Sequence, residues 1–148
     1  MFRQPFHRVR LLRNTAKSLA VIPSSETRLG CAELDLQHEQ LGEKLLRFTD
    51  LTVSHASRIE AIDLLRELIM DTGLHFGYEE SLMKESDYPD FDHHFRQHAG
   101  MMTELGLLLE RLHDSAGSQT VRHAVFLHDW YRRHFDISDR KLVEWLKR

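Results

Sequence analysis

Histidine and carboxylate side chains recur at helical spacing in this sequence. His75 and Glu79 are four residues apart, and so are His94 and His98. On a helix, residues four apart lie one turn apart on the same face. Imidazole and carboxylate groups are common ligands of transition metals. Eleven of the 148 residues are histidine, and the paired spacing predicts that some of them form a metal site on helices.

Three further candidates are His38, His134 and, five residues after the latter, Asp139. Each signal is weak by itself, because a single histidine on a helix is commonly a hydrogen-bonded residue at the edge of the core. The joint pattern is stronger. Buried histidines and acids without partners would together cost several kcal/mol, and a shared cation removes that cost. We therefore predict one site to which all the predicted helices contribute.

The number and type of these groups restrict the metal. Five imidazoles, two carboxylates and no thiolate form a borderline-to-hard ligand set, and seven ligands are more than one zinc ion needs. Two metals that share bridging carboxylates would use all seven. A ferritin-like site would instead require a Glu-x-x-His pair on each of two helices. The sequence has one such pair, Glu110 and His113, which we interpret as solvated surface.

The elements that would position these residues are predicted to be helices alone. β-branched residues do not form alternating runs, which argues against a sheet. Apolar residues at helical spacing, with breaks around Pro89 and Gly117, predict helices over residues 32–54, 58–84, 91–114 and 119–135, and a short extension over 141–146. Four helices of similar length with short connections predict an all-α, up-down-up-down four-helix bundle.

Charge divides the chain into two parts. The first 25 residues carry five basic and no acidic side chains, whereas the whole chain has a formal charge of −3, so the remainder carries −8. We interpret residues 1–25 as a poorly ordered basic N-terminal arm that could contact a protein partner, and 26–148 as one domain. The acidic domain argues against nucleic acid as a partner, because phosphate binding requires a basic face.

Cysteine content and hydropathy indicate the cellular compartment in which the protein is expected. Cys31 is the single cysteine, which excludes an internal disulfide bond and suits the reducing cytoplasm. No apolar run approaches the roughly 20 residues that a membrane helix needs, so we expect no membrane insertion. The oligomeric state stays open.

Three segments of the sequence resemble a known family. The segment His75-Phe76-Gly77-Tyr78-Glu79, followed by Asp87-Tyr88-Pro89-Asp90-Phe91 and His94-Phe95-Arg96-Gln97-His98, resembles the central signature of bacterial hemerythrins. Leu34-Asp35-Leu36-Gln37-His38 resembles their first ligand motif, and Trp130-Tyr131-Arg132-Arg133-His134 with Asp139 resembles the last. The resemblance extends over about residues 29–146, with all seven ligand positions filled in order.

The resemblance implies a non-haem di-iron centre that binds dioxygen reversibly. It assigns His94, His98 and His134 to one iron, and His38 and His75 to the other, which keeps an open position for dioxygen. Glu79 and Asp139 would bridge the two irons together with an oxo or hydroxo group. The spacing of the residues alone predicts that the ligands converge, but it does not assign any of them to a particular iron.

The function that follows is oxygen carriage, storage or sensing by a binding protein that is not an enzyme. The alternative is a redox protein that handles peroxide, nitric oxide or labile iron at the same site. A third hypothesis is a regulatory module whose N-terminal arm reports the oxidation state of the site to a partner. The ligands are common to all three, and the lifetime of the oxygenated form would distinguish carriage from turnover.

Helix geometry makes two further predictions about the ligands. Asp139 would lie about 140° from His134 on an ideal helix, so both can face inward only if the backbone loosens around Ile137 and Ser138. Ser138 could cause this by offering a competing hydrogen bond. In the third helix we prefer His94 to His93 as the ligand, because it shares a face with His98.

Several other residues have an expected place. Asp35, three residues before His38, either orients that imidazole as a hydrogen-bond acceptor or is simply an acidic residue favoured at a helix N-terminus. We expect the remaining histidines, His55, His93, His113, His123 and His128, at the surface or its boundary.

Trp130 and Tyr131 are predicted to line the oxygen pocket. Tyr131 occupies a position that is usually aliphatic, often leucine, in the family that the chain resembles. A hydroxyl there can donate a hydrogen bond, and we hypothesise that it shortens the life of the oxygenated form. The opposing interpretation is that Tyr131 points toward the end of the bundle and meets water.

Overall fold

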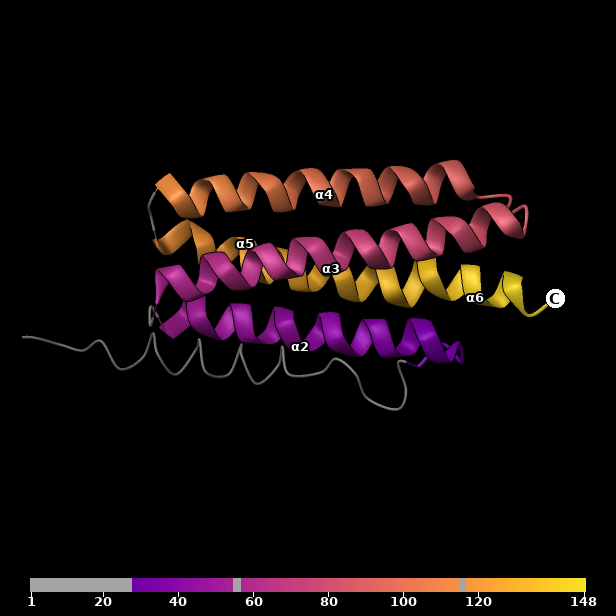
Figure 1. Cartoon of the computed structure of the whole chain (residues 1–148), viewed down its shortest axis with the longest axis horizontal. Coiled ribbons are helices and arrows are strands. Elements are labelled where there is room, and N and C mark those ends of the chain that lie inside the picture. The colour runs from indigo at the N-terminus through magenta and orange to yellow at the C-terminus, as the bar shows by residue number, and fades with distance from the viewer. Residues whose placement is uncertain (1–27, 55–56, 115–116) are drawn as a thin grey trace, which may run out of the picture.

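The protein is a bundle of four long helices in this computed structural model, which describes residues 28–54, 57–114 and 117–148 (Figure 1). The helices are α2 (Ala32–Ser54), α3 (Arg58–Glu85), α4 (Phe91–Asp114) and α5 (Gly117–Arg133), followed by the π-helix η1 (His134–Asp139) and the short α6 (Arg140–Leu146). Those segments contain no strand. The predicted all-α, up-down-up-down fold is confirmed.

The ends of the four long helices agree with the expected ones to within two residues, but the last of them is followed by a wider turn that was not predicted as a helix type. That helix begins at Gly117 and changes to a π-helix at His134, where the sequence predicted an α-helix to residue 135. The basic arm, 1–25, and His55 lie outside the described residues. Over the part of the chain that is described, no helix is both long enough and apolar enough to cross a membrane.

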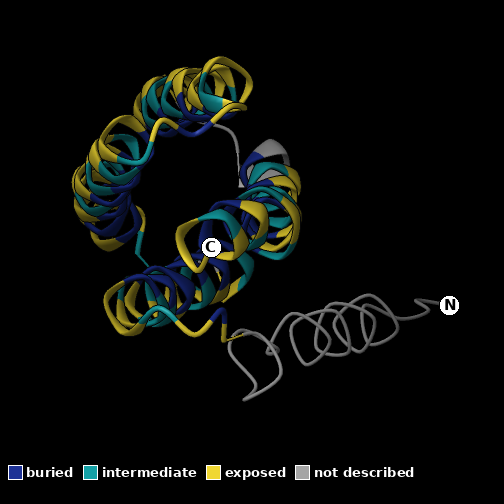
Figure 2. Ribbon diagram, turned by 90° about the vertical axis from the view of Figure 1, so that its right-hand side faces the viewer, coloured by how far each residue is buried: buried dark blue, intermediate teal, exposed yellow. Residues whose placement is uncertain are grey.

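The helices pack in a ring. α2 packs against α3, α3 against α4, α4 against α5, and α5 returns to α2. The view along the bundle shows buried residues facing the common interior and exposed residues facing outward (Figure 2). Ser57 starts α3 from an extended backbone, and its hydroxyl accepts the N–H of Glu60, which satisfies one of the free donors of that helix end.

The apolar core is unevenly distributed along the bundle. Most of the largest cluster lies where an antiparallel arrangement brings together the C-terminal halves of α2 and α4 and the N-terminal halves of α3 and α5, and the cluster extends along the bundle to Phe76, Tyr131 and Phe135 beside the histidines. Its members where those halves meet include Phe48, Leu65, Leu108, Leu112 and Ala124. Two small clusters lie around Val143 and Leu142 near the C-terminus of the chain. A layer of buried histidines and carboxylates separates these apolar regions.

Candidate metal centre

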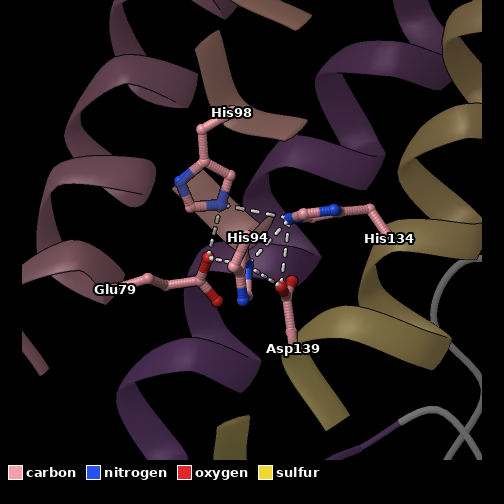
Figure 3. A group of neighbouring side chains, drawn as sticks. All are labelled: Glu79, His94, His98, His134 and Asp139. Atoms are coloured by element: carbon pink, nitrogen blue, oxygen red, sulfur yellow. Dashed lines mark hydrogen bonds and ion pairs between the residues drawn. The ribbon is translucent and has the colours of Figure 1, made fainter. Parts of the chain in front are cut away.

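All seven predicted ligands are buried in this polar layer and face one another. Their relative exposures range from 0% for the two carboxylates to 5% for His38. The ligand-type atoms form two overlapping groups, in each of which all atoms lie within 4.8 Å of one another. One group comprises Glu79, His94, His98, His134 and Asp139 (Figure 3), and the other comprises His38, His75, Glu79 and Asp139.

The first group has three imidazoles whose Nε2 atoms converge. The Nε2 atom of His134 lies 3.1 Å from that of His98 and 3.2 Å from that of His94. Ligands at right angles around a metal at about 2.0–2.1 Å are about 3 Å apart. The observed separations therefore have the size expected between neighbouring ligands of one cation.

The second group has two imidazoles and uses the same carboxylates. His38 Nε2 lies 3.1 Å from Asp139 Oδ2. His75 Nε2 lies 3.8 Å from Glu79 Oε2 and 3.9 Å from Asp139 Oδ2. His75 is therefore farther from both carboxylates than His38 is from Asp139.

Glu79 and Asp139 belong to both groups, and each carboxylate faces imidazoles of both. Glu79 Oε2 lies 3.1 Å from His98 Nε2, and Asp139 Oδ1 lies 3.1 Å from His134 Nε2. None of the four carboxylate oxygens, however, forms a hydrogen bond of acceptable geometry. Buried polar atoms without partners are rare in folded proteins, and here the chemistry of the donor set fits cations placed between them.

Two of the imidazoles are neutral at ordinary pH, so each has a lone pair that can bind a metal ion. Burial, followed by the charges of neighbouring histidines, lowers the pKa of His75 to about 3 and that of His98 to about 2. Burial also lowers the pKa of His94, but its close contacts with the carboxylates of Asp139 and Glu79 outweigh that effect and raise the value to about 9. Without a cation, His94 therefore carries a proton at neutral pH and partly neutralises the carboxylates.

The surroundings shift the pKa values of the two carboxylates in opposite directions. Burial and the nearby charge of Asp139 raise the pKa of Glu79 well above its usual value. Burial acts on Asp139 in the same sense, but His134, His38 and His94 together hold its pKa well below the usual value. A dication would replace the proton on Glu79, because metal ligands bind in their deprotonated form.

The π-helix brings His134 and Asp139 to one face. Its i→i+5 turn is wider than that of an α-helix, so residues five apart face the same side, and both side chains are buried. The loosening that we predicted around Ile137 and Ser138 is therefore present. Its predicted cause is not, because the Ser138 hydroxyl donates across to Gln97 Oε1 of α4 at 2.7 Å and not to the backbone of its own helix.

The other histidines divide between surface and interior. His93 is exposed and accepts a hydrogen bond from Gln97, whereas its neighbour His94 faces the cluster. Glu110 and His113 are exposed, as expected for a pair on the surface. The prediction for His128 is wrong, because its side chain is buried on the inner side of α5 and only 4% of the residue is exposed.

Aromatic rings cover the imidazoles on their outer sides. Phe135 stacks on His38 and Phe76 stacks on His98, each with ring centroids 3.8 Å apart. Trp130 stacks on His134 at 4.5 Å, so it lies beside the three-histidine group. These rings fix the orientation of the imidazoles and keep water from the cluster.

Tyr131 is fully buried, and its hydroxyl is hydrogen-bonded to the hydroxyl of Thr72. The interpretation that it points to the bundle end and meets water is therefore wrong. Its ring packs against Phe135, which in turn stacks on His38. Burial raises the pKa of Tyr131, against the opposing effect of the Thr72 hydrogen bond, so the phenol remains protonated and able to donate.

Sequence reasoning missed two polar residues that contact the imidazoles. Gln37 Oε1 lies 2.9 Å from His75 Nδ1, and Glu80 Oε1 lies 3.0 Å from His98 Nδ1. Both directly adjoin a predicted ligand in the chain, and a neighbour on a helix points about 100° away, toward the adjacent helix. Their position next to a ligand in the sequence was therefore the signal that could have identified Gln37 and Glu80.

Asp35 has the second of its two predicted roles, that of an acidic residue near a helix N-terminus. Its two carboxylate oxygens accept the backbone N–H groups of Leu29 at 2.7 Å and Gly30 at 3.0 Å. It therefore fastens the segment that precedes α2, as an acidic residue at a helix N-terminus can. It does not orient the imidazole.

A groove between α2 and α3 reaches the second group. It has a volume of about 220 Å³, and its lining includes Gln37, Leu41, Asp71, Leu74 and His75. His75 is the one predicted ligand in this lining. The two-histidine side is thus the side of the cluster that the groove approaches.

Comparison with known proteins agrees with the fold and the cluster. The family model of the hemerythrin HHE cation binding domain matches residues 29–146. A bacteriohemerythrin of Campylobacter jejuni is 28% identical over 76% of this chain and 84% of its own, and one of Ralstonia nicotianae is 27% identical over 86% and 90%. A crystal structure of a hemerythrin leucine-to-tyrosine mutant, 24% identical, superposes with a TM-score of 0.74 over 87% of this chain and 99% of its own. The chain belongs to the hemerythrin family.

Proposed function

We propose that the chain holds two iron ions in the polar layer and uses them to bind dioxygen reversibly. The observation that carries this proposal is the pair of overlapping donor groups that share Glu79 and Asp139. Family membership supports a non-haem iron site, and one cation would leave part of the seven-residue set without a partner. The free Cys31 suits a reducing compartment, and we propose the cytoplasm.

In this proposal the ligands divide as the two groups do. His94, His98 and His134 hold one iron, His38 and His75 hold the other, and the two carboxylates bridge them. The aromatic rings on the imidazoles hold these ligands in place and exclude water. When bound, the irons supply the electrons that reversible dioxygen binding requires.

Access from the α2–α3 groove supports an open coordination position on the two-histidine iron. The groove contacts His75, whose Nε2 atom lies 3.8 and 3.9 Å from the two carboxylates. A small neutral molecule would meet the centre from this side. The three-histidine group, in contrast, is covered by Phe76 and Trp130.

Iron loading tests the proposal directly. The purified protein is reconstituted with ferrous iron under anaerobic conditions, exposed to air and then to vacuum, and its visible spectrum is followed throughout. We expect about two irons per chain and a band that appears with air and reverses under vacuum. A protein that binds no iron, or only one ion per chain, contradicts the proposal.

Two adjacent histidines provide a matched pair of variants. His94→Ala removes a group that faces the cluster, whereas His93→Ala removes an exposed neighbour. We expect iron content to fall in the first variant and to stay near that of the unchanged protein in the second. The opposite result would mean that the register of α4 at the site is wrong.

A second candidate function is the handling of peroxide, nitric oxide or labile iron, and the buried hydroxyl of Tyr131 favours it. Tyr131 is a neutral donor one ring away from His38. We propose that Tyr131 lines the oxygen pocket from this side and shortens the life of the oxygenated form. Trp130, which packs on His134, contributes to the dry wall of the same centre.

The test compares unchanged protein with Tyr131→Phe and Tyr131→Leu. Phenylalanine removes the hydroxyl alone, so it separates hydrogen bonding from pocket volume. We expect the visible band of the oxygenated form to decay more slowly in Tyr131→Phe. Equal decay rates in the two proteins would remove the reason for preferring this second function.

A further inference from the structure

Two of the imidazoles are held by a side chain on the nitrogen that faces away from the cluster, and the two supporting groups differ in charge. Gln37 Oε1 is 2.9 Å from His75 Nδ1, and Glu80 Oε1 is 3.0 Å from His98 Nδ1. In both cases the Nε2 atom faces the carboxylates of the cluster. The amide supports the two-histidine group, and the carboxylate supports the three-histidine group.

The direction of the hydrogen bond at His75 follows from a third residue. Gln37 Nε2 donates to Glu33 Oε1 at 2.7 Å, and an ionised carboxylate can only accept. The amide NH₂ of Gln37 therefore faces Glu33, and its oxygen faces His75. The Nδ1 atom of His75 must then be the donor, which leaves the lone pair of its Nε2 atom directed at the cluster.

At His98 the donor of the hydrogen bond follows from the supporting residue alone. Glu80 is itself an acceptor when ionised, so His98 Nδ1 carries the proton and donates it. Here, however, a full negative charge lies against the far side of the ring. A carboxylate in this position raises the basicity of a metal-ligating imidazole, whereas an amide dipole does so to a smaller extent.

We infer that Glu80 and Gln37 are positioning residues that make the two metal positions unequal. Glu80 strengthens the three-histidine position, and Gln37, orientated by Glu33, leaves the two-histidine position weaker. This inference rests on the proposed two-iron centre. It predicts that metals load in order, first at the three-histidine position and then at the position that the α2–α3 groove approaches.

Exchanging carboxylate and amide tests the charge while it keeps the hydrogen bonds. Glu80→Gln retains an oxygen that can accept from His98, but removes the charge. The double variant Glu33→Gln with Gln37→Glu exchanges the two groups on α2, so net charge is conserved and a carboxylate now accepts from His75. Glu33→Gln alone is the matched control, because its amide oxygen still accepts from Gln37.

The measurement is an anaerobic titration with ferrous iron that yields two stepwise dissociation constants. Loss of a supporting group of this kind typically changes metal affinity by about 10-fold to 100-fold. We expect Glu80→Gln to weaken the tighter step about 10-fold, the double variant to tighten the weaker step about 10-fold, and the control to change neither. The reduction potential of the loaded centre should rise in the first variant and fall in the second.

The outcomes separate this inference from the proposed function. If the unchanged protein takes up fewer than two irons, the two-iron centre itself is refuted. If it takes up two, but both constants stay within about twofold in Glu80→Gln and in the double variant, the inference is overturned. The double variant matters because it predicts tighter binding, which damage to the fold would not produce.

Discussion

The two ends of the bundle are built from the same four helices but are held together by different forces. At one end, Phe48, Leu65 and Leu108 are at most 2% exposed and pack in a continuous apolar cluster. Each such side chain gains about 1.5–3 kcal/mol from burial. Toward the other end, before the two small apolar clusters, the interior holds five histidines and two carboxylates whose oxygens have no hydrogen-bond partner of good geometry.

This difference separates folding from function along one bundle. The apolar end can stabilise the helices without any ligand. The polar end opposes folding until something replaces the lost hydration of its carboxylates, since an unsatisfied buried polar group costs about 1–3 kcal/mol. Substitutions at the apolar end should therefore change stability and spare metal binding, and substitutions at the polar end should do the reverse.

The largest expected effect is at Glu79. Glu79→Gln should abolish binding of both irons, because an amide cannot supply the bridging charge. The apo-protein should be as stable as the unchanged apo-protein or more so, because burial and Asp139 already disfavour the ionised carboxylate, whose pKa is raised. Iron analysis and urea denaturation measure the two effects. The control is Glu85→Gln, an exposed change on the same helix, which should alter neither iron content nor stability. A di-iron spectrum retained in Glu79→Gln would contradict the bridging role.

The second prediction concerns the apolar end. Leu108 lies ten residues beyond His98, about 15 Å along the helix axis. Leu108→Ala should lower the free energy of unfolding by about 2–5 kcal/mol, with and without iron, because it opens a cavity in the core. Iron content should remain at about two per chain. The control is Leu107→Ala, which truncates a neighbour that is 38% exposed and should change the free energy of unfolding by less than about 0.5 kcal/mol. Loss of iron from Leu108→Ala would show that stability and metal binding are not separated along the bundle.

The third prediction is the pH dependence of the apo-protein. His75 and His98, with pKa values lowered to about 3 and about 2 against 6.5, bind protons only in the unfolded chain below pH 6.5, so stability falls as pH falls. The raised pKa of Glu79 offsets one of these two protons. Because two imidazoles outnumber the one carboxyl, the free energy of unfolding of the apo-protein should fall as pH falls from 6.5 to 5.

Above pH 6.5 the sign reverses. The stabilisation from His94, whose pKa is raised to about 9, is complete below pH 6.5 and is lost as pH rises to about 9. Glu79 acts in the same direction until pH reaches its raised pKa. Urea midpoints of the apo-protein at several pH values should therefore peak near pH 6.5. A steady rise from pH 5 to 9 would show that the cluster is not buried in the folded apo-protein.

The smallest expected effect is at Ser138, where α4 holds the π-helix. Ser138→Ala removes the hydrogen bond to Gln97 and should cost about 1 kcal/mol, with iron still bound. A double-mutant cycle with Gln97→Leu measures the coupling between the two side chains. Zero coupling would mean that this contact has no part in holding the wide turn.

The sequence predicted the candidate site better than it predicted the surroundings. Helical spacing placed His75 with Glu79 and His94 with His98 because residues four apart share a face in any α-helix. The same reasoning detected that His134 and Asp139 require a loosened backbone. It attributed this to Ser138 and its own helix, and the actual partner, Gln97, lies on another helix.

The open alternatives and the error share one physical cause. For Asp35 and Tyr131 the sequence left two environments open, and for His128 it predicted the wrong one, because nothing local in the chain decides between them. Whether a phenol meets water or Thr72 depends on how α5 is rotated against α3. Likewise, Gln37 and Glu80 became supports of imidazoles only because neighbouring helices bring His75 and His98 within 3.0 Å.

By itself, the sequence determined the helices and their order, since periodicity and helix breakers are properties of local chain geometry. The tertiary structure alone decided which imidazole is supported by a charge and which by an amide, and which side of the cluster the groove reaches. These are distances between residues far apart in the chain, and they follow from how the four helices pack.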